Sequence, residues 1–560
     1  MRHFVSLLAL FVGLCIAAQA RSATPLPAPD GQARSAPAPG SSRAGVSYDV
    51  TIHARDGAVI AFTVHEPLQM VGGKTYPLLM TGPGFGMPRV NSLMRELVAP
   101  PGTPLADTFT TKQYTDAGYV VVAFDQRGFG QSGGQVSIMD PDQDGDSLVR
   151  IVDWAEANLP YLMRRDGNLV LGTYGASYGG GFQLLLNNVD PRRRLDAMIP
   201  SITWNDLGYS LNPGAVPKSA YALALILAGE ASSRLNSDPR VRDLAAHGLL
   251  DGRFTDADNA MLRYHSNRYF CDGVSQPGKR IATHPPKVDA LFLQGMFDVI
   301  FNLNEGLDNA QCLRETGGDV RLIGYNVGHV LPSGTGLVID GIGSPGDFSR
   351  CGPHVADAVS RTWFDAKLKR DPAAITALGR VPRNCITIAS NGEGVVVDAV
   401  KVGGTKAMVP KTLVPSLSPL PLSVPLYRAT APTVVAGIPT ATVVIANPLP
   451  LPGLPGGLPL GVGSDDAMIF VAIARSRQGL PSQLEILNDQ VRPLRGFGTH
   501  VLELNGIGTK LAAGDQLHLL ISASSLPQFP IEIARNPLLL AVSVSGSVQL
   551  PVLGNVATVR

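Results

Sequence analysis

The stretch Asn168-Leu-Val-Leu-Gly-Thr-Tyr-Gly-Ala-Ser-Tyr-Gly179 decides how the chain folds. An apolar run typical of a buried strand leads into Gly175-Ala-Ser-Tyr-Gly179, and a second apolar run, Phe182-Gln-Leu-Leu-Leu186, follows it. A G-x-S-x-G between a strand and a helix is the pattern of a nucleophile elbow, a sharp turn whose strained backbone requires small flanking residues. The pattern therefore predicts an α/β sheet that presents the hydroxyl of Ser177 as a nucleophile.

Two later strand ends supply the other groups that such a serine needs. A hydroxyl is a weak nucleophile unless a base takes its proton and a third group orients the base. Asp298 follows the strand-like run Val288–Leu293, and His329 follows Asp319–Ile323. The carboxyl ends of strands in an open α/β sheet line the ligand crevice, and the order serine, acid, histidine is that of the α/β-hydrolases. We therefore expect Ser177, Asp298 and His329 to form a catalytic triad.

His354 is the alternative base, because it too follows Asp298 along the chain. Its segment, Cys351-Gly-Pro-His354, begins a predicted helix rather than ending a strand, so His329 is preferred.

A glycine-rich loop after an early strand suits the binding of an oxyanion. Tyr76–Met80 reads as that strand, and it ends in Thr81-Gly-Pro-Gly-Phe-Gly86. Acyl transfer needs backbone N–H groups aimed at the oxygen that becomes negative, and they come from the residue after the nucleophile and from such a loop. We expect Tyr178 and Phe85 to donate these N–H groups, with Gly84 as the alternative to Phe85.

A further motif carries a family resemblance. Phe124-Asp-Gln-Arg-Gly-Phe-Gly-Gln-Ser-Gly-Gly134 resembles the D-x-R-G-x-G-x-S-x-G segment of the X-prolyl dipeptidyl-peptidase and cocaine-esterase-like family of α/β-hydrolases. Asp146, Trp154 and the elbow at residues 168–180 follow it as they do in that family. The resemblance covers roughly residues 45–545.

The resemblance assigns roles to residues already singled out. It implies that Asp298 is the acid and His329 the base, and that the C-terminal part is a jelly-roll domain. Members of the family often offer a tyrosine hydroxyl to the oxyanion from the loop after the third strand. This chain has Phe85 there, so a backbone donor must replace that hydroxyl.

Strand-like and helix-like segments alternate over residues 45–382, which predicts an α/β-hydrolase domain with a mostly parallel sheet and helices on both faces. The helix-like stretches Lys218–Glu230 and Asp256–Arg268 fall between residues 201 and 287. We expect them to form a helical cap that shapes the pocket, the alternative being extra core packing. The predicted strands are Tyr48–Ile52, Val59–Val64, Tyr76–Met80, Tyr119–Phe124, Leu169–Gly172, Ala197–Pro200, Ala290–Leu293 and Val320–Ile323.

Residues 383–560 differ in character from the rest of the chain. They are dense in proline and contain short β-branched runs such as Thr440–Ile445 and Met468–Ile473. Short strands separated by turn signals are typical of a β-sandwich, so we predict a C-terminal jelly-roll domain.

The first residues predict export. Residues 1–20 have a basic start, an apolar middle and a small-x-small end, Ala18-Gln-Ala20, which is the pattern of a signal peptide cleaved after Ala20. Residues 21–44 are rich in Pro, Ala, Ser and Gly and predict a disordered linker. The protein is expected to be secreted or periplasmic, without a membrane span, because no later apolar run is long enough.

The composition of the chain argues against some classes of ligand. The net charge is +1 and the chain has no long basic block, which argues against nucleic acid and acidic membranes as ligands. The triplet Arg192-Arg-Arg194 reads as a solvated turn after a helix. We expect no cofactor and no metal, because the cysteines lack metal-ligand spacing.

Four cysteines remain after the signal peptide, which allows two disulfides in an oxidising compartment. Three pairings are open. We favour Cys271 with Cys312 and Cys351 with Cys385, because each pair joins segments close in sequence and near a predicted domain junction.

Together these features predict a secreted serine hydrolase that cleaves a small peptide or ester substrate through an acyl-enzyme. The resemblance favours X-prolyl dipeptidyl-peptidase-like activity, with an acyl esterase of the cocaine-esterase type as the alternative. A dipeptidyl-peptidase needs an acidic group for the substrate's amine, and Glu230, Asp251 and Asp256 are available in the cap. The alternative from another class is a non-catalytic exported binding protein on a hydrolase scaffold.

Overall fold

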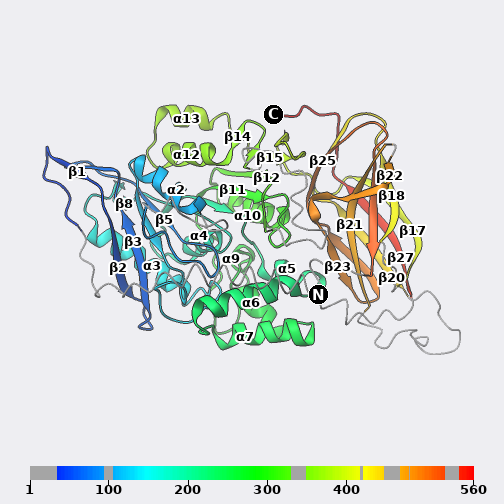
Figure 1. Ribbon diagram of the computed structural model, residues 1–560, viewed down its shortest axis with the longest axis horizontal. Coiled ribbons are helices and arrows are strands. Elements are labelled where there is room, and N and C mark those ends of the chain that lie inside the picture. Colours follow the sequence, from blue (N-terminus) through cyan, green and yellow to red (C-terminus); the bar gives the residue numbers. More distant parts are fainter. Residues whose placement is uncertain are drawn as a thin grey trace.

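The computed structural model describes residues 34–93, 105–329, 349–415, 421–446, 467–478, 480–523 and 541–560. The predicted signal peptide lies outside the described residues. The chain forms an α/β body followed by an all-β body, which lie side by side in Figure 1.

The α/β body is built on a ten-stranded sheet with the order β16-β15-β12-β11-β10-β9-β5-β6-β3-β2. Neighbouring strands run parallel from β6 to β15, whereas β2, β3 and β16 join antiparallel at the two edges. The strands are β2 Ser47–His53, β3 Val59–His65, β5 Leu78–Thr81, β6 Val120–Phe124, β9 Leu171–Ala176, β10 Leu195–Ser201, β11 Asp289–Gly295, β12 Val320–Tyr325, β15 Asn384–Thr387 and β16 Gly394–Val396.

Helices cover both faces of this sheet, as the alternating pattern predicts. Successive strand residues point to opposite faces, and in β5 Leu78 and Met80 belong to one apolar core while Leu79 belongs to the other. The fully buried Trp363 of α12 anchors the core on the Leu79 side. Helices α3 Asp144–Asn158, α4 Tyr178–Val189 and α10 Leu303–Glu315 pack on one face, and α2 Leu105–Asp116, α12 Ala356–Lys367 and α13 Pro372–Leu378 on the other.

A set of helices is inserted between β10 and β11, as expected for a cap, and α6 and α7 are seen at the bottom of Figure 1. The cap packs on the loop after β5, because a Cβ atom on Gly229 of α6 would lie 2.8 Å from the ring of Phe85. The inserted helices are α5 Leu207–Leu211, α6 Ser219–Ser233, α7 Pro239–Ala246, α8 Asp256–Tyr264 and α9 Asn267–Asp272.

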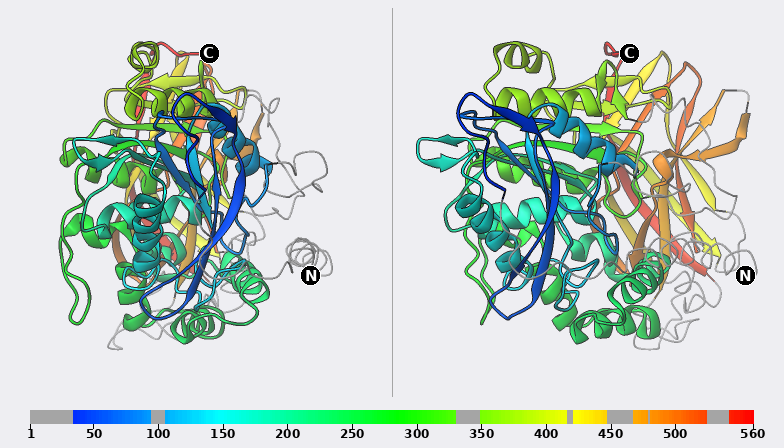
Figure 2. Two further views of the ribbon diagram at one scale, coloured as in Figure 1. Left: turned by 90° about the vertical axis from the view of Figure 1, so that its left-hand side faces the viewer. Right: turned by 60° about the vertical axis from the view of Figure 1, so that its left-hand side comes forward.

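The C-terminal body is a β-sandwich, seen clearly in the right-hand view of Figure 2. Sheets of order β17-β27-β20-β24 and β18-β26-β21-β22, with β23 beside β21, enclose an apolar core rich in Val, Ile and Leu. A smaller sheet, β25-β19-β28, completes it. The strands are β17 Thr405–Pro415, β18 Leu422–Arg428, β19 Thr433–Gly437, β20 Thr440–Ala446, β21 Met468–Arg477, β22 Leu480–Ile486, β23 Arg492–Arg495, β24 Gly498–Glu503, β25 Ile507–Leu511, β26 Gln516–Ser522, β27 Ala541–Leu550 and β28 Val552–Gly554.

Two expected boundaries differ from the structure. The hydrolase sheet continues past residue 383, because β15 pairs in parallel with β12 and β16 pairs with β15. Two short consecutive strands with no helix between them have the same sequence pattern as a β domain, which explains the difference. At the other end, β1 (Ser42–Ala44) pairs with β4 (Gln69–Val71), so ordered structure begins before residue 45.

The prediction of a solvated arginine turn is wrong for Arg194. Its side chain is fully buried, and it bonds both carboxylate oxygens of Asp190 as well as Asp153 and Glu156. A planar guanidinium with several N–H donors can be buried when carboxylates surround it. A run of three arginines does not reveal which member those carboxylates enclose.

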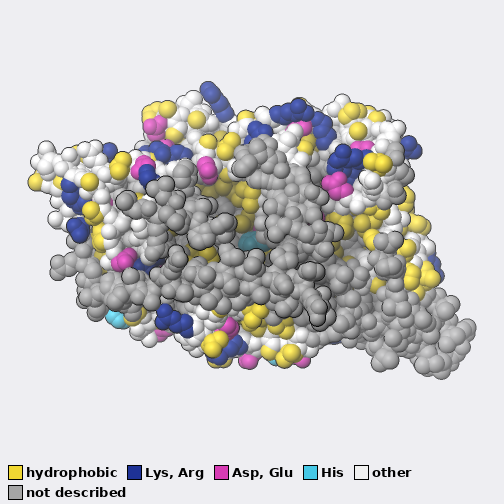
Figure 3. Space-filling view, in the orientation of Figure 1, with side chains coloured by type: hydrophobic (Ala, Val, Ile, Leu, Met, Phe, Trp, Pro, Cys, Tyr) yellow, Lys and Arg dark blue, Asp and Glu magenta, His cyan; other side chains and the backbone are white. Residues whose placement is uncertain are grey.

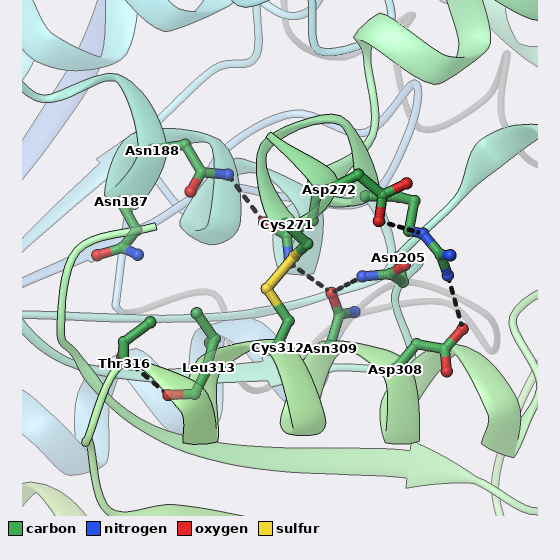
Figure 4. Close-up of a disulfide and its surroundings, with 12 residues drawn as sticks. Asn187, Asn188, Asn205, Cys271, Asp272, Asp308, Asn309, Cys312, Leu313 and Thr316 are labelled. Atoms are coloured by element: carbon green, nitrogen blue, oxygen red, sulfur yellow. Dashed lines mark hydrogen bonds and ion pairs between the residues drawn. A yellow bond between two sulfur atoms is a disulfide. The ribbon is translucent and has the colours of Figure 1, made fainter. Parts of the chain in front are cut away.

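Both disulfides join the cysteines that the sequence analysis favoured, with Cys271 bonded to Cys312 and Cys351 to Cys385. The first bond connects α9 of the cap to α10, among several asparagine side chains (Figure 4). The second connects the short strand β13 (Arg350–Cys351) to β15 in the core. Among the described residues, no helix is both long and apolar enough to cross a membrane.

Candidate active site

Ser177 lies at the sharp turn between β9 and α4. Its backbone has φ 58° and ψ −119°, a conformation that is strained for any residue other than glycine. The flanking glycines are required by space, because a Cβ atom on Gly179 would lie 2.2 Å from the carbonyl oxygen of Gly82, and one on Gly175 would lie 2.6 Å from that of Gly179. These features are those of a nucleophile elbow.

Of the three residues expected to form a triad, His329 lies within hydrogen-bond distance of both of the others. His329 Nε2 is 2.8 Å from the hydroxyl of Ser177, and His329 Nδ1 is 2.7 Å from Oδ2 of Asp298. A carboxylate only accepts, so Nδ1 carries the proton and Nε2 is left to accept from the serine. The imidazole is 22% exposed while the carboxylate is fully buried. Substrate can therefore reach the serine and the imidazole, whereas the acid is shielded from water.

Asp298 is fixed by its own loop. Its Oδ1 accepts hydrogen bonds from the backbone N–H groups of Ile300 (3.0 Å) and Phe301 (2.7 Å), which leaves Oδ2 for the histidine. The loop before His329 approaches it closely, since a Cβ atom on Gly328 would lie 2.3 Å from the Cα of Asp298. The ring of Phe301 meets that of His329 edge to face, with centroids 5.3 Å apart. The imidazole is therefore held by a carboxylate at its Nδ1 edge and by an aromatic ring at its side.

The loop after β5 lies against the elbow, as the oxyanion prediction requires. Phe85 packs edge to face on Tyr178, with ring centroids 5.2 Å apart, and also on Phe129 at 4.9 Å. The phenol of Tyr178 is buried and accepts a bond from the backbone N–H of Met139, and burial raises its pKa well above the usual value. The side chain of Tyr178 is thus structural, and its backbone N–H, with that of Phe85 or Gly84, stays the predicted oxyanion donor.

The D-x-R-G-x-G-x-S-x-G segment forms a tight turn around Asp125 that supports this loop. Asp125 is buried, pairs with Arg89 and accepts from the backbone N–H of Gln131 at 2.8 Å. A Cβ atom on Gly130 would lie 2.3 Å from the carboxyl carbon of Asp125, so glycine is required there. Phe129, from the same turn, is the ring against which Phe85 packs. The motif therefore shapes the site without supplying a reacting group.

His354, the alternative base, lies in a different element from His329. It lies in the two-residue strand β14 (His354–Val355), directly opposite Cys351 of the disulfide with Cys385. Ser177 and Asp298 are bonded to His329 instead. The geometry thus favours the base preferred from the sequence.

The three acidic residues of the cap considered for amine binding are not equivalent. Asp251 and Asp256 are exposed, whereas Glu230 is half-buried and follows Gly229, the residue packed on Phe85. Of these three carboxylates, Glu230 is therefore the one that adjoins a residue in contact with the Phe85 loop.

The sequence analysis missed two residues at the site. Lys218 of the cap bonds the backbone carbonyl oxygen of Val299, and Gln490 of the β-sandwich bonds that of Asp298. Neither belongs to a motif, and neither pattern nor spacing distinguishes them from any other lysine or glutamine.

Comparisons with known proteins agree with this architecture. Residues 56–330 match the family model for X-Pro dipeptidyl-peptidase (S15 family). The fold is similar to a crystal structure of a CocE/NonD family hydrolase from Staphylococcus aureus, with 14% identity, a TM-score of 0.61 and coverage of 91% of this chain and 94% of that one. An alpha-amino acid ester hydrolase is similar at 14% identity and a TM-score of 0.57, covering 95% of this chain and 99% of the other.

A curated relative matches a shorter stretch. An uncharacterized 31.7 kDa protein from the traX-finO intergenic region of Escherichia coli is 32% identical over 68 residues, which are 12% of this chain and 22% of that protein. The family match covers the α/β body from before β3 to just past His329, and with it every residue of the serine–histidine–aspartate arrangement. Over residues 56–330 the chain thus matches the X-Pro dipeptidyl-peptidase (S15) family, and its fold is that of the CocE/NonD family hydrolases, which together support a hydrolase of the α/β-hydrolase fold.

Proposed function

We propose that Ser177 is the nucleophile of an acyl-transfer reaction, His329 its base and Asp298 the acid that orients the base. The observation that carries this proposal is the continuous pair of hydrogen bonds, 2.8 Å from the serine hydroxyl to Nε2 and 2.7 Å from Nδ1 to the carboxylate. On the face drawn in Figure 3, a histidine side chain reaches the surface near the centre, beside hydrophobic side chains. The imidazole of His329 is 22% exposed and meets the ring of Phe301, which suits a substrate with an uncharged acyl group.

In the first half of the reaction, the hydroxyl proton of Ser177 moves to Nε2 of His329 while Oγ bonds the carbonyl carbon of the substrate. The oxygen that becomes negative is held by the backbone N–H groups of Tyr178 and Phe85. The bond to the leaving amine or alcohol then breaks, and the leaving group takes the proton from Nε2. In the second half, water gives a proton to Nε2 and attacks the acyl-enzyme, and Ser177 recovers its proton as the acid product leaves.

The substrate class is proposed as a short peptide cleaved after a proline at the second position. The family description supports it, and we propose that Glu230, which follows the Gly229 packed on Phe85, holds the free amine of the substrate. An acyl ester is the second candidate, supported by the similarity of the fold to an ester hydrolase. The chemistry at the carbonyl is the same for both, and only the pocket discriminates.

Two measurements on one preparation test these statements. A fluorophosphonate probe should label the wild-type protein at Ser177 and fail to label Ser177→Ala. Chromogenic Gly-Pro and Ala-Pro amides should then be compared with short-chain acyl esters by kcat/KM. Higher kcat/KM for the amides supports the dipeptidyl-peptidase, higher kcat/KM for the esters supports the esterase, and absence of labelling contradicts the roles given to the triad.

We further propose that the protein is exported. The two disulfides support export, because such bonds persist in oxidising compartments and are rare in reducing ones. N-terminal sequencing of the protein recovered outside the cytoplasm should begin at Arg21, directly after the predicted cleavage site. A mature protein that still begins at Met1 would contradict the signal-peptide prediction.

A further inference from the structure

The segment Met296–Asn302, called the acid loop here because it carries Asp298, is held by side-chain donors along most of its length. The backbone carbonyl oxygens of residues 296, 298, 299, 300 and 301 each accept a hydrogen bond from a side chain. A loop with no ladder partner usually leaves such groups to water. Here three side chains replace the water, and they come from three different parts of the chain.

Lys218 holds the acid loop from the cap. It precedes α6, is 5% exposed, and donates from Nζ to the carbonyl oxygens of Val299 (2.7 Å) and Ile300 (3.2 Å). The charges that act on it are Arg492, which repels it, and Asp298, which attracts it. Burial lowers the pKa of Lys218 to about 7. Such a group is retained in a buried position only when its donors are used, as they are here.

Gln490 holds the same loop from the β-sandwich. It lies before β23, is 4% exposed, and donates from Nε2 to the carbonyl oxygens of Asp298 (3.0 Å) and Met296 (3.3 Å). The orientation of its amide is fixed, because Oε1 accepts from Nδ2 of Asn505 at 2.9 Å. A flipped amide would direct oxygen at the two carbonyl groups, so only this orientation satisfies every partner.

The third donor, Gln294, belongs to the strand that leads into the loop and bonds the carbonyl oxygen of Phe301 at 2.5 Å. It would be present in the hydrolase fold alone. The cap and the sandwich therefore add the bonds to the four carbonyl groups at residues 296, 298, 299 and 300.

We propose that Lys218 and Gln490 are positioning residues for the hydrolytic reaction, which clamp the acid loop from the cap and from the β-sandwich so that Asp298 presents Oδ2 to His329. The proposal rests on the proposed roles of Ser177, His329 and Asp298. The two peptide groups whose carbonyl oxygens Lys218 bonds are the ones whose N–H groups fix Oδ1 of Asp298, and Gln490 bonds the carbonyl oxygen of Asp298 itself. Rotation of those peptides would turn the carboxylate away from the imidazole.

The clamp acts on catalysis through geometry. A displacement of about 1 Å in a group that orients a reacting side chain can lower a rate on the order of 100-fold. Both side chains bond the backbone of the acid loop rather than a reacting group, so substrate binding should be affected little. The expected signature is a fall in kcat with KM nearly unchanged.

The test uses Lys218→Met and Gln490→Met in the full chain. Both keep the length of the side chain and remove its donors. We expect kcat to fall about 10- to 100-fold with KM within about twofold, and the rate of fluorophosphonate labelling to fall by a similar factor. Labelling requires the activated serine but no fit to a natural substrate, so this result does not depend on whether the enzyme prefers peptides or esters.

The matched control variants remove the same kind of donor from side chains that bond carbonyl groups outside the acid loop. Lys401 also donates to a backbone carbonyl, that of Val552 at 2.7 Å, and Gln276 donates to that of Ala260 at 3.0 Å. Lys401→Met and Gln276→Met should leave kcat and labelling unchanged. If Gln490→Met does not fold, Asn505→Ala frees the amide of Gln490 without removing it, and a smaller loss of kcat in the same direction is expected.

The outcomes separate this proposal from the one on which it rests. Folded Lys218→Met and Gln490→Met proteins with wild-type kcat and labelling rates overturn the clamp, as does a loss confined to KM or to thermal stability. A wild-type protein that the probe does not label overturns the assignment of the triad, and the clamp with it.

Discussion

At the residue scale, the backbone of Ser177 is the clearest sign of function. A non-glycine residue held at positive φ costs about 1–3 kcal/mol and is retained only where the surroundings enforce it. Here the glycines at 175 and 179 allow the neighbouring loop to pass, and the strain places the hydroxyl at the histidine. A substitution that removes only the hydroxyl of Ser177 can therefore test catalysis without disturbing the fold.

Ser177→Ala should abolish turnover while leaving the fold intact, because it removes one partly exposed oxygen from a turn. We expect kcat to fall by a factor on the order of 10⁴ to 10⁶, as for other triad nucleophiles. Steady-state kinetics and thermal melting of the two proteins check both halves of the prediction. A variant that keeps more than about a tenth of the wild-type kcat would contradict the nucleophile assignment.

Activity should rise with pH. An imidazolium cannot accept the proton of Ser177, so His329 acts as a base only when it is neutral, and protonation at low pH removes activity. His329→Ala should lose both the rate and this pH dependence. The matched control is His354→Ala, which should retain both, and the reverse pattern in kcat/KM against pH would show that the base is misassigned.

At the element scale, α10 connects the catalytic sheet to the cap through one buried carboxyl group. Glu305, in its first turn, accepts from the backbone N–H groups of Asn205 and Asp206 and from the hydroxyl of Ser210. Burial raises the pKa of Glu305 to about 8. The start of the cap is thus attached to the helix that follows the acid loop by a group whose charge changes near neutrality.

This group makes folding stability depend on pH. The folded protein retains the proton of Glu305 up to about pH 8, whereas an unfolded glutamate releases it near its ordinary pKa of 4.5. Between these values the folded state binds more protons, so the contribution to the free energy of unfolding is fully present below pH 4.5 and is lost as pH rises toward 8.

Glu305→Gln keeps an acceptor oxygen for the two N–H groups but cannot titrate. Urea denaturation at pH 5 and pH 8 should show a smaller fall in unfolding free energy for the variant than for the wild type, by on the order of 3 kcal/mol. Equal falls in the two proteins would show that Glu305 is not the group responsible. Asp144, whose pKa burial raises to about 7, is present in both proteins and cancels in the comparison.

At the scale of the whole molecule, sheet, cap and sandwich meet at the acid loop, and the disulfides secure the parts around it. Cys271–Cys312 joins the cap to α10, and Cys351–Cys385 joins two segments of the core beside the sheet edge. Cys351 and Cys385 are fully buried, whereas Cys271 and Cys312 are half-buried. The two bonds should therefore differ in their reactivity toward a reductant.

Non-reducing peptide mapping of the exported protein should find Cys271 linked to Cys312 and Cys351 linked to Cys385. Mild reduction should open the half-buried bond first, since access of the attacking thiolate limits the exchange. Loss of either bond by paired Cys→Ala substitution should lower stability by about 3–4 kcal/mol in the chain-entropy model, measured by urea denaturation. Four free thiols in the exported protein would contradict both the pairing and the argument for an oxidising compartment.

The sequence by itself determined the catalytic sheet and the candidate triad, because their signals are local. A strand, a turn that requires glycine and a helix are adjacent in the chain at Ser177, and Asp298 and His329 each follow a strand directly. Parallel strands bring such ends to one edge of the sheet, so three local patterns were sufficient to predict a contact between distant residues. The cysteine pairs were favoured for the same reason, since each joins neighbouring segments.

Only the tertiary structure decided which side chains hold those groups in place. Lys218 and Gln490 are 81 and 192 residues from the carbonyl groups that they bond, and no spacing or motif connects such positions. The burial of Arg194 and the extension of the sheet through β15 and β16 likewise could not be predicted from local sequence. Each depends on which surfaces pack together across the whole fold, a balance of burial and desolvation that local sequence does not contain.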